Sequence, residues 1–213
     1  ASEPLGYDPF YDYATRSTKS KKTGRKYELA FALSEVHKYL TRVRFTNDFS
    51  VCENEAPFEC VVLHNVTEHL PDVGYALDQV AGVMETGSLL VFHHHNFFSW
   101  DGHHSPPRTE DKIDLSDPRH LELIDWAHLD FDPPKNHPII RSTLNRITLN
   151  ELRLEVEARF DVLLWQEIPS PENRGGGRFG NIPATALSEY SWRDLTTKNV
   201  LGVAVLTNPE NRR

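Results

Sequence analysis

Residues 58–98 read FECVVLHNVTEHLPDVGYALDQVAGVMETGSLLVFHHHNFF, and three structural elements follow one another in this stretch. The nearly continuous apolar run at 58–65 is typical of a strand that is buried on both faces of a parallel sheet. A helical pattern of apolar residues starts near Asp72, and a second apolar run at 89–95 predicts another buried strand. The stretch therefore predicts a strand, a crossover helix and a parallel strand.

The sequence on both sides of this stretch continues the alternation. Thr148, followed three residues later by Glu151, has the spacing of a capping box at a helix start. Alternating strands and helices favour an α/β, doubly wound and mostly parallel sheet with helices on both faces, and we expect one domain over residues 1–213. The other expected elements are strands near 4–8, 43–48, 161–168 and 199–208 and helices near 24–40 and 143–160.

Residues 99–142 interrupt the pattern as an insertion that is rich in His and Pro. The segment contains two tryptophans among its polar residues, so we expect an ordered lid with at most one short helix near 117–128. A second irregular segment, RGGGRFG at 174–180, is expected to be a flexible loop.

Composition limits the classes of partner. The net charge of −8 argues against a general nucleic-acid binder, and no apolar run of membrane-spanning length is present in the sequence. Only two cysteines occur, and Cys60 is expected to be a small core residue. We therefore expect a cytoplasmic protein without a signal peptide, acting on a soluble small-molecule or glycan-like substrate; the oligomeric state stays open.

Polar side chains follow the predicted strands at their carboxyl ends. In open α/β sheets, ligands bind outside that edge. Three interpretations of these residues stay open: a cofactor and substrate rim, a metal site, or polar groups that only finish the strands. The residues are Asp8, Asp48, His64, Asn65 and His93 to His95.

The stretch PFECVVLHNVTEHLPDVGYALDQVAGVMETGSLLVFHHHNF resembles the class I S-adenosylmethionine-dependent methyltransferases, in particular the methyltransferase type 11-like group. LNRITLNELRLEVEARFDVLLWQE, residues 144–167, is similar to the late helix and sixth strand of that family. TTKNVLGVAVLTN, residues 196–208, is similar to its seventh strand, which runs antiparallel between its neighbours. The resemblance implies a Rossmann-like sheet and S-adenosylmethionine as cofactor.

The resemblance assigns cofactor contacts to five residues. Asp8 corresponds to the acid that accepts hydrogen bonds from the ribose hydroxyls, and the alternative for Asp8 is a turn residue before Pro9. Asp48 corresponds to the acid near the adenine amine, with Phe49 beside the ring; the alternative for Asp48 is a turn at a strand end. His64 and Asn65 correspond to the segment beside the methionine end, and their alternative is polar capping of the strand end.

Two further features of the family bear on this resemblance. Glu68 and His69 match its EH pair, which mostly orders the loop and the helix start. The resemblance also implies a first strand and a Gly-rich turn ahead of residue 4, and neither is present in the sequence. The segment at 174–180 is no substitute, because it does not lead from a strand into a helix.

The histidines after residue 92 suggest a catalytic base. Alternation along a strand points His93 and His95 one way and His94 the other. Histidine has a pKa near neutral pH without any tuning, as a base for a hydroxyl acceptor requires. We assign this role to His95 or His104.

Other residues of the same segment are expected to contact the substrate. They are His94, Trp100 and His103. Zinc or iron ligation by histidines with a carboxylate such as Asp101 is the rival interpretation. No tight metal-binding spacing supports it, so no metal ligand is assigned.

The sequence thus predicts a methyltransferase that uses S-adenosylmethionine to methylate a small-molecule or glycan-like acceptor, on an oxygen atom. Two alternatives remain. One is a non-catalytic or truncated methyltransferase-like scaffold domain, which the lack of the Gly-rich turn favours. The other is a metal-dependent enzyme that uses the histidine cluster.

Overall fold

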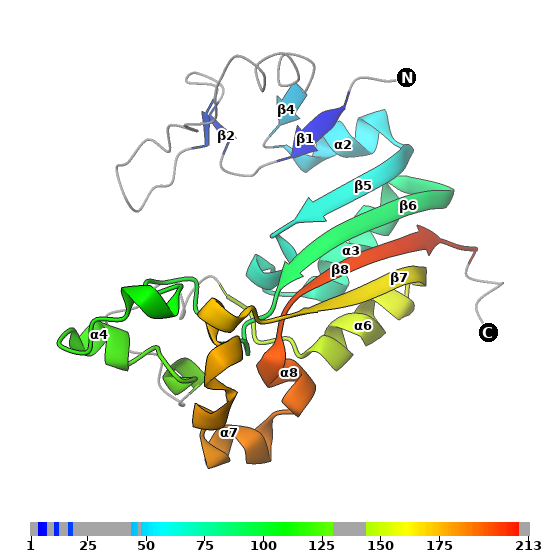
Figure 1. Cartoon of the computed structure of the whole chain (residues 1–213). Coiled ribbons are helices and arrows are strands. Elements are labelled where there is room, and N and C mark those ends of the chain that lie inside the picture. The colour runs from blue at the N-terminus through cyan, green and yellow to red at the C-terminus, as the bar shows by residue number, and fades with distance from the viewer. Residues whose placement is uncertain are drawn as a thin grey trace. The chain divides into compact units, whose positions relative to one another are not determined.

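The chain divides into two compact units, residues 1–57 and 58–213, in a computed structural model (Figure 1). Each unit is described by itself, and the expectation of a single domain stays a prediction. The structure describes residues 4–7, 11–12, 17–18, 44–46, 48–129 and 144–208.

The first unit contains two short strand pairs. Strand β1 (Leu5–Tyr7) pairs in parallel with β4 (Arg44–Thr46), as expected for neighbouring strands of a parallel sheet. Strands β2 (Tyr11–Asp12) and β3 (Ser17–Thr18) form an antiparallel pair. The helix expected near 24–40 lies outside the described residues.

Helix α2 (Phe49–Glu55), also in the first unit, was not expected from the sequence. It is short and begins at Asp48, whose Oδ1 accepts a hydrogen bond from the Ser50 backbone N–H at 3.0 Å. This is the N-cap arrangement that satisfies a free amide at a helix start. The ring of Phe49 packs edge-on against Tyr7, with 5.5 Å between centroids.

The second unit is built on a four-stranded sheet in the order β5-β6-β8-β7 (Figure 1). Strands β5 (Phe58–His64) and β6 (Met84–His95) are parallel. Strand β8 (Thr197–Leu206) is antiparallel both to β6 and to β7 (Phe160–Pro169). The α/β class with a mostly parallel sheet is confirmed, and so is an antiparallel last strand between two parallel neighbours.

Two helices cover one face of this sheet. Helices α3 (Val73–Gly82) and α6 (Leu149–Glu157) pack on each other and on the strands around a core that includes Leu77, Leu90 and Leu152. Asp72 caps α3 by accepting from the Tyr75 N–H, and the capping box at the start of α6 is confirmed.

The long strand β6 begins five residues earlier than expected, at Met84 rather than 89. Gly87 has a φ of +94°, and the register between β6 and β5 shifts between Phe58 and Cys60. The first part of β6 is therefore irregular, and glycine permits this backbone conformation. The expectation that Cys60 is a core residue is wrong, because its side chain is exposed on the sheet face that α3 and α6 leave uncovered.

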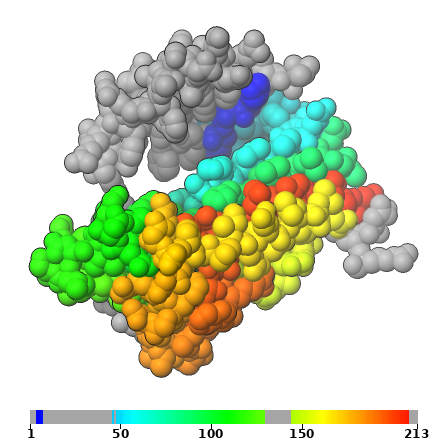
Figure 2. All heavy atoms as spheres, in the orientation of Figure 1, coloured from blue at the N-terminus to red at the C-terminus, as the bar shows by residue number. Residues whose placement is uncertain are grey.

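A second core lies beyond the carboxyl end of β6. The segment after β6 packs there against residues 170–196, and Figure 2 shows the two, in green and orange, as one continuous body. Its regular elements are η2 (Glu110–Lys112), α4 (Pro118–Leu121), η3 (Ala127–Leu129), η4 (Glu172–Arg174), η5 (Gly176–Asn181), α7 (Ala184–Glu189) and α8 (Trp192–Thr196).

The segment at 174–180 is ordered in two 3-10 turns, contrary to the flexible loop that was expected. Gly175 has a φ of +92°, and a Cβ atom there would lie 2.2 Å from Cβ of Trp100. Only glycine permits both this conformation and this approach. The glycines therefore serve close packing around a buried indole. Among the described residues, no helix is long and apolar enough to cross a membrane.

Candidate functional site

The histidines of β6 alternate between the two faces of the sheet, as expected. The partner strands place His93 and His95 on the face away from α3 and α6, with His94 between them on the opposite face. His94 is 1% exposed, and its Nδ1 lies 2.9 Å from the Thr67 hydroxyl oxygen. Burial, followed by its two neighbouring histidines, lowers the pKa of His94 to about 3.

The carboxyl ends of β5 and β6 meet in a small polar group. The His64 and His93 rings stack at 5.3 Å, and Nδ1 of His93 donates to Oδ1 of Asn65 at 2.5 Å. Asn65 has a φ of +53°, a left-handed conformation in which asparagine is enriched. Its backbone N–H donates to the His93 carbonyl oxygen at 2.9 Å. These contacts hold the turn after β5 against the end of β6.

Asn96 fixes the turn that leaves β6. Its side chain is fully buried, and its amide nitrogen donates to the carbonyl oxygens of Asp194 at 2.6 Å and Thr197 at 2.7 Å. Its Oδ1 accepts from the Phe98 backbone N–H at 3.1 Å. One side chain therefore ties the turn after β6 to the start of β8.

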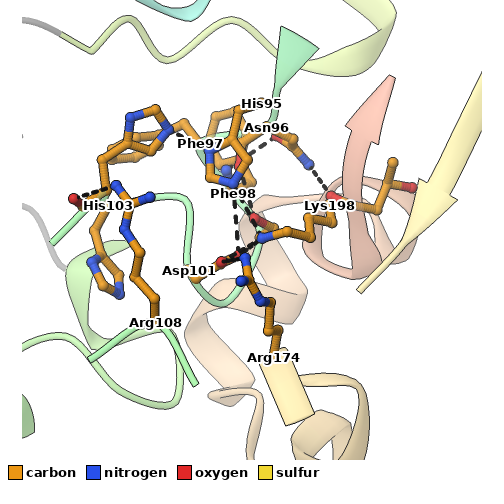
Figure 3. Close-up of polar contacts among 12 residues, drawn as sticks. His95, Asn96, Phe97, Phe98, Asp101, His103, Arg108, Arg174 and Lys198 are labelled. Atoms are coloured by element: carbon orange, nitrogen blue, oxygen red, sulfur yellow. Dashed lines mark hydrogen bonds and ion pairs between the residues drawn. The ribbon is translucent and has the colours of Figure 1, made fainter. Parts of the chain in front are cut away.

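A buried ion pair lies behind this turn (Figure 3). Lys198, near the start of β8, donates from Nζ to both carboxylate oxygens of Asp101, and Arg174 Nη1 lies 3.6 Å from Asp101 Oδ2. In Figure 3, Lys198 and Arg174 both point to this carboxylate. Burial favours a raised pKa for Asp101, but hydrogen bonds from His95 and Lys198 outweigh it and hold the pKa well below its usual range. Asp101 is therefore ionised.

His95 connects this ion pair to His104. Nε2 of His95 lies 3.7 Å from Asp101 Oδ1 and 3.3 Å from Lys198 Nζ, while its Nδ1 is hydrogen-bonded to Nε2 of His104. Burial, with His95 next in effect, lowers the pKa of His104 to about 3. The two candidate bases thus form one hydrogen-bonded unit, with a carboxylate behind it.

Glu68 and His69 approach the same unit from the 3-10 turn η1 (Thr67–His69). One ligand atom each of Glu68, His69 and His104 lies within 4.8 Å of the other two. Glu68 is 1% exposed, and within the described ranges neither of its carboxylate oxygens has a hydrogen-bond partner. Burial raises the pKa of Glu68, although main-chain groups and His69 act in the opposite direction.

The predicted substrate contacts are buried. His94, Trp100 and His103 are at most 1% exposed, so none of these three side chains is open to a substrate in this conformation. Trp100 packs in the second core, and His103 accepts from the Ser105 backbone N–H at 3.1 Å and faces His128 at 5.1 Å between ring centroids. Their contact with a substrate stays a prediction.

The predicted cofactor residues fall into separate parts of the chain. Asp8 lies outside the described residues, while Asp48 and Phe49 belong to the first unit. His64 and Asn65 lie in the second unit, and the structure brings them together with His93.

Sequence reasoning missed two members of the polar network around Asp101, Lys198 and Arg174, and it expected Glu68 mainly to order the loop and the helix start. Lys198 is the second residue of the apolar strand β8 and could have been noticed as a charge at the start of a buried element. No local signal pairs it with Asp101, because 97 residues separate the two.

Comparisons with known proteins gave matches at the level of structure alone. No family model matches the chain, and no curated protein sequence matches it.

Similar solved structures include two S-adenosylmethionine-dependent methyltransferases and a cyclase. An S-adenosylmethionine-dependent methyltransferase from Mesorhizobium loti is 15% identical with a TM-score of 0.43, covering 96% of this chain and 81% of that one. A putative S-adenosylmethionine-dependent methyltransferase from Listeria monocytogenes is 13% identical with a TM-score of 0.45, covering 98% and 82%. The [4+2]-cyclase SpnF is 13% identical with a TM-score of 0.43, and the chain spans 62% of its length.

Proposed function

We propose that this protein is a methyltransferase that binds S-adenosylmethionine and methylates an oxygen atom of a small-molecule or glycan-like acceptor. The observation that carries the proposal is the polar rim at the carboxyl ends of the parallel strands β5 and β6, with β8 antiparallel beside β6. This is the edge at which open α/β sheets bind their ligands. The strand directions agree with those that the sequence resemblance implies.

The residues at this rim suit one end of the cofactor. Oδ1 of Asn65 is taken by His93, which leaves its amide N–H groups to donate to the methionine carboxylate. His64 is exposed at the same turn. We assign the methionine end to these two residues and the ribose to Asp8.

Methyl transfer requires the protein mainly to position the two reactants and to remove a proton from the acceptor. The cofactor supplies an activated methyl group on a sulfonium. The acceptor oxygen forms a bond to the methyl carbon as the carbon–sulfur bond breaks, and the acceptor proton must leave. Holding the reactants in line supplies much of the rate enhancement in such a displacement.

We assign the proton to His95, whose Nδ1 is hydrogen-bonded to His104, because a pKa of about 3 makes His104 a poor base at neutral pH. The Asp101 carboxylate lies 3.7 Å from Nε2 of His95. Lys198 helps to keep Asp101 ionised, and these two residues thus position the base without contacting the acceptor.

The test is calorimetric titration of the metal-stripped chain with S-adenosylhomocysteine. Saturable binding is the expected result. Asp8→Ala should weaken binding by about 1–3 kcal/mol, the range for losing hydrogen bonds to a charged acceptor. Asp161→Ala serves as the matched control, because Asp161 is exposed at the start of β7, and it should leave affinity unchanged.

Two results would contradict the proposal at different levels. Absence of binding in a folded sample would favour the non-catalytic scaffold. Binding that Asp8→Ala leaves intact would keep the cofactor and remove Asp8 from its site.

A further inference from the structure

The buried carboxylate of Glu68, when ionised, requires a compensating positive charge. The side chain is 1% exposed, and neither oxygen has a hydrogen-bond partner in the described part of the chain. An ionised carboxylate in such a place carries a large desolvation cost unless it is paired with a positive charge or coordinates a metal. Two cationic side chains of the surrounding network have other partners: Lys198 faces Asp101, and Arg108 donates from Nη2 to the carbonyl oxygen of His104 at 2.6 Å.

Two imidazoles lie beside this carboxylate. Ligand atoms of Glu68, His69 and His104 are mutually within 4.8 Å, and the rings of His69 and His104 meet edge to face at 5.3 Å. We propose that Glu68, His69 and His104 bind one divalent transition-metal ion. The inference does not depend on methyl transfer.

The backbone on both sides of the three residues is held in place. Asn145 donates from its side-chain amide to the carbonyl oxygens of Thr67 at 2.7 Å and Leu70 at 2.8 Å, and its backbone N–H donates to the Glu68 carbonyl oxygen at 2.8 Å. These bonds fix the turn that carries two of the ligands. His104 sits in a left-handed conformation, with a φ of +58°, in the ordered turn after β6.

The third ligand also has the outer partners that metal-binding histidines usually have. Nδ1 of His95 is hydrogen-bonded to Nε2 of His104, and the Asp101 carboxylate lies 3.7 Å from Nε2 of His95. When His104 carries its proton on Nε2, its Nδ1 lone pair is available to an ion. A carboxylate behind a histidine chain fixes the tautomer and raises the basicity of the ligand.

The donor set selects the kind of ion. Two imidazoles and one carboxylate suit Zn²⁺ or Fe²⁺, whereas Mg²⁺ and Ca²⁺ prefer oxygen donors. Three protein ligands leave at least one coordination position for water or a substrate oxygen, as in catalytic zinc sites. The bound ion would occupy the Nδ1 lone pair of His104, so His104 would act as a ligand and not as a base.

The experiment measures Zn²⁺ binding to the untagged full chain by calorimetry, with Co²⁺ absorption as the spectroscopic readout. Wild type should bind one Zn²⁺ per chain. Glu68→Gln and His104→Gln should each weaken binding by about 100-fold or more, because loss of an outer partner alone costs about 10–100-fold. His120→Gln is the matched control: its Nδ1 accepts from the Asp114 N–H at 2.9 Å, outside the site, and affinity should not change.

Thermal unfolding without metal guards against misfolded variants. Glu68→Gln removes an unpaired buried charge, so the metal-free variant should be at least as stable as wild type, and only wild type should gain stability with Zn²⁺. Lack of a one-to-one site in wild type, or unchanged affinity in Glu68→Gln, would overturn the inference. So would a clear loss of metal-free stability in Glu68→Gln, since Glu68 would then have a protein partner. S-adenosylhomocysteine binding, measured separately, tests methyl transfer independently.

Discussion

The two cores of the second unit are stabilised by different chemistry. The core under the sheet consists of apolar side chains from α3, α6 and the strands. The core beyond β6 packs tryptophans and leucines around buried polar groups, among them Asp101, His103, His128 and Lys198. An apolar core depends on volume and tolerates rearrangement, whereas a buried polar network depends on every partner being present. The comparison predicts which single substitutions each core tolerates without a large loss in the free energy of unfolding.

Removal of Lys198 should have the largest effect. Lys198→Met leaves Asp101 buried with only the more exposed Arg174 and His95 beside it, and we expect a loss of about 3–5 kcal/mol in the free energy of unfolding. Urea unfolding of the metal-stripped protein at neutral pH measures this loss.

A second variant shows whether the loss comes from the stranded charge. Asp101→Asn combined with Lys198→Met removes both charges at similar volume, and it should recover at least half of the lost stability. If the double variant is as unstable as Lys198→Met alone, the polar core depends on packing after all, and the contrast between the two cores disappears.

A cavity in the apolar core should cost somewhat less. Leu152 in α6 is fully buried, and Leu152→Ala should lower the unfolding free energy by about 2–5 kcal/mol through lost transfer energy and the remaining cavity. This loss should be the same at pH 7 and pH 5, because the immediate cluster is apolar. A loss that varies strongly with pH would show that the two cores are energetically coupled. Leu154→Ala is the matched control, since Leu154 lies on the same helix with an exposed side chain.

The difference between the cores also explains what the sequence could predict. Periodicity identified β5, α3, α6, β7 and β8, because each of them buries one regular apolar pattern. The capping box of α6 was predictable for the same reason, being a local contact between Thr148 and Glu151. The direction of β8 came from the family resemblance rather than from its own residues.

The second core follows no period, so the sequence predicted its residue types and not their partners. The histidines were visible as candidates, but the ion pair of Asp101 with Lys198 joins residues that lie 97 positions apart in the sequence. The glycines at 174–180 indicated flexibility, although they allow close packing on Trp100. Helix α2 was missed because its seven residues are too short to show a helical period.

The smallest of the expected effects is the pH response of His128, a fully buried residue of the second core. Its Nε2 donates to the Phe97 carbonyl oxygen at 3.0 Å, and burial lowers its pKa to about 4. Backbone contacts to Phe97 and Leu123 and the charge of Asp101 oppose this shift, while Arg146 adds to it. The imidazole is therefore buried in its neutral form.

Protonation then favours the unfolded chain. Between the unfolded pKa of about 6.5 and the folded pKa of about 4, the unfolded state binds more protons, so the stability present above pH 6.5 is lost as the pH falls. For His128 alone the loss from pH 7 to pH 5 is about 2 kcal/mol. His128→Gln keeps a donor for Phe97 and cannot titrate, so its unfolding free energy should fall less than that of wild type over this interval. Equal pH slopes for the two proteins would show that the pKa of His128 is the same in the folded and unfolded chains, and that the second core accommodates a charge the apolar core could not.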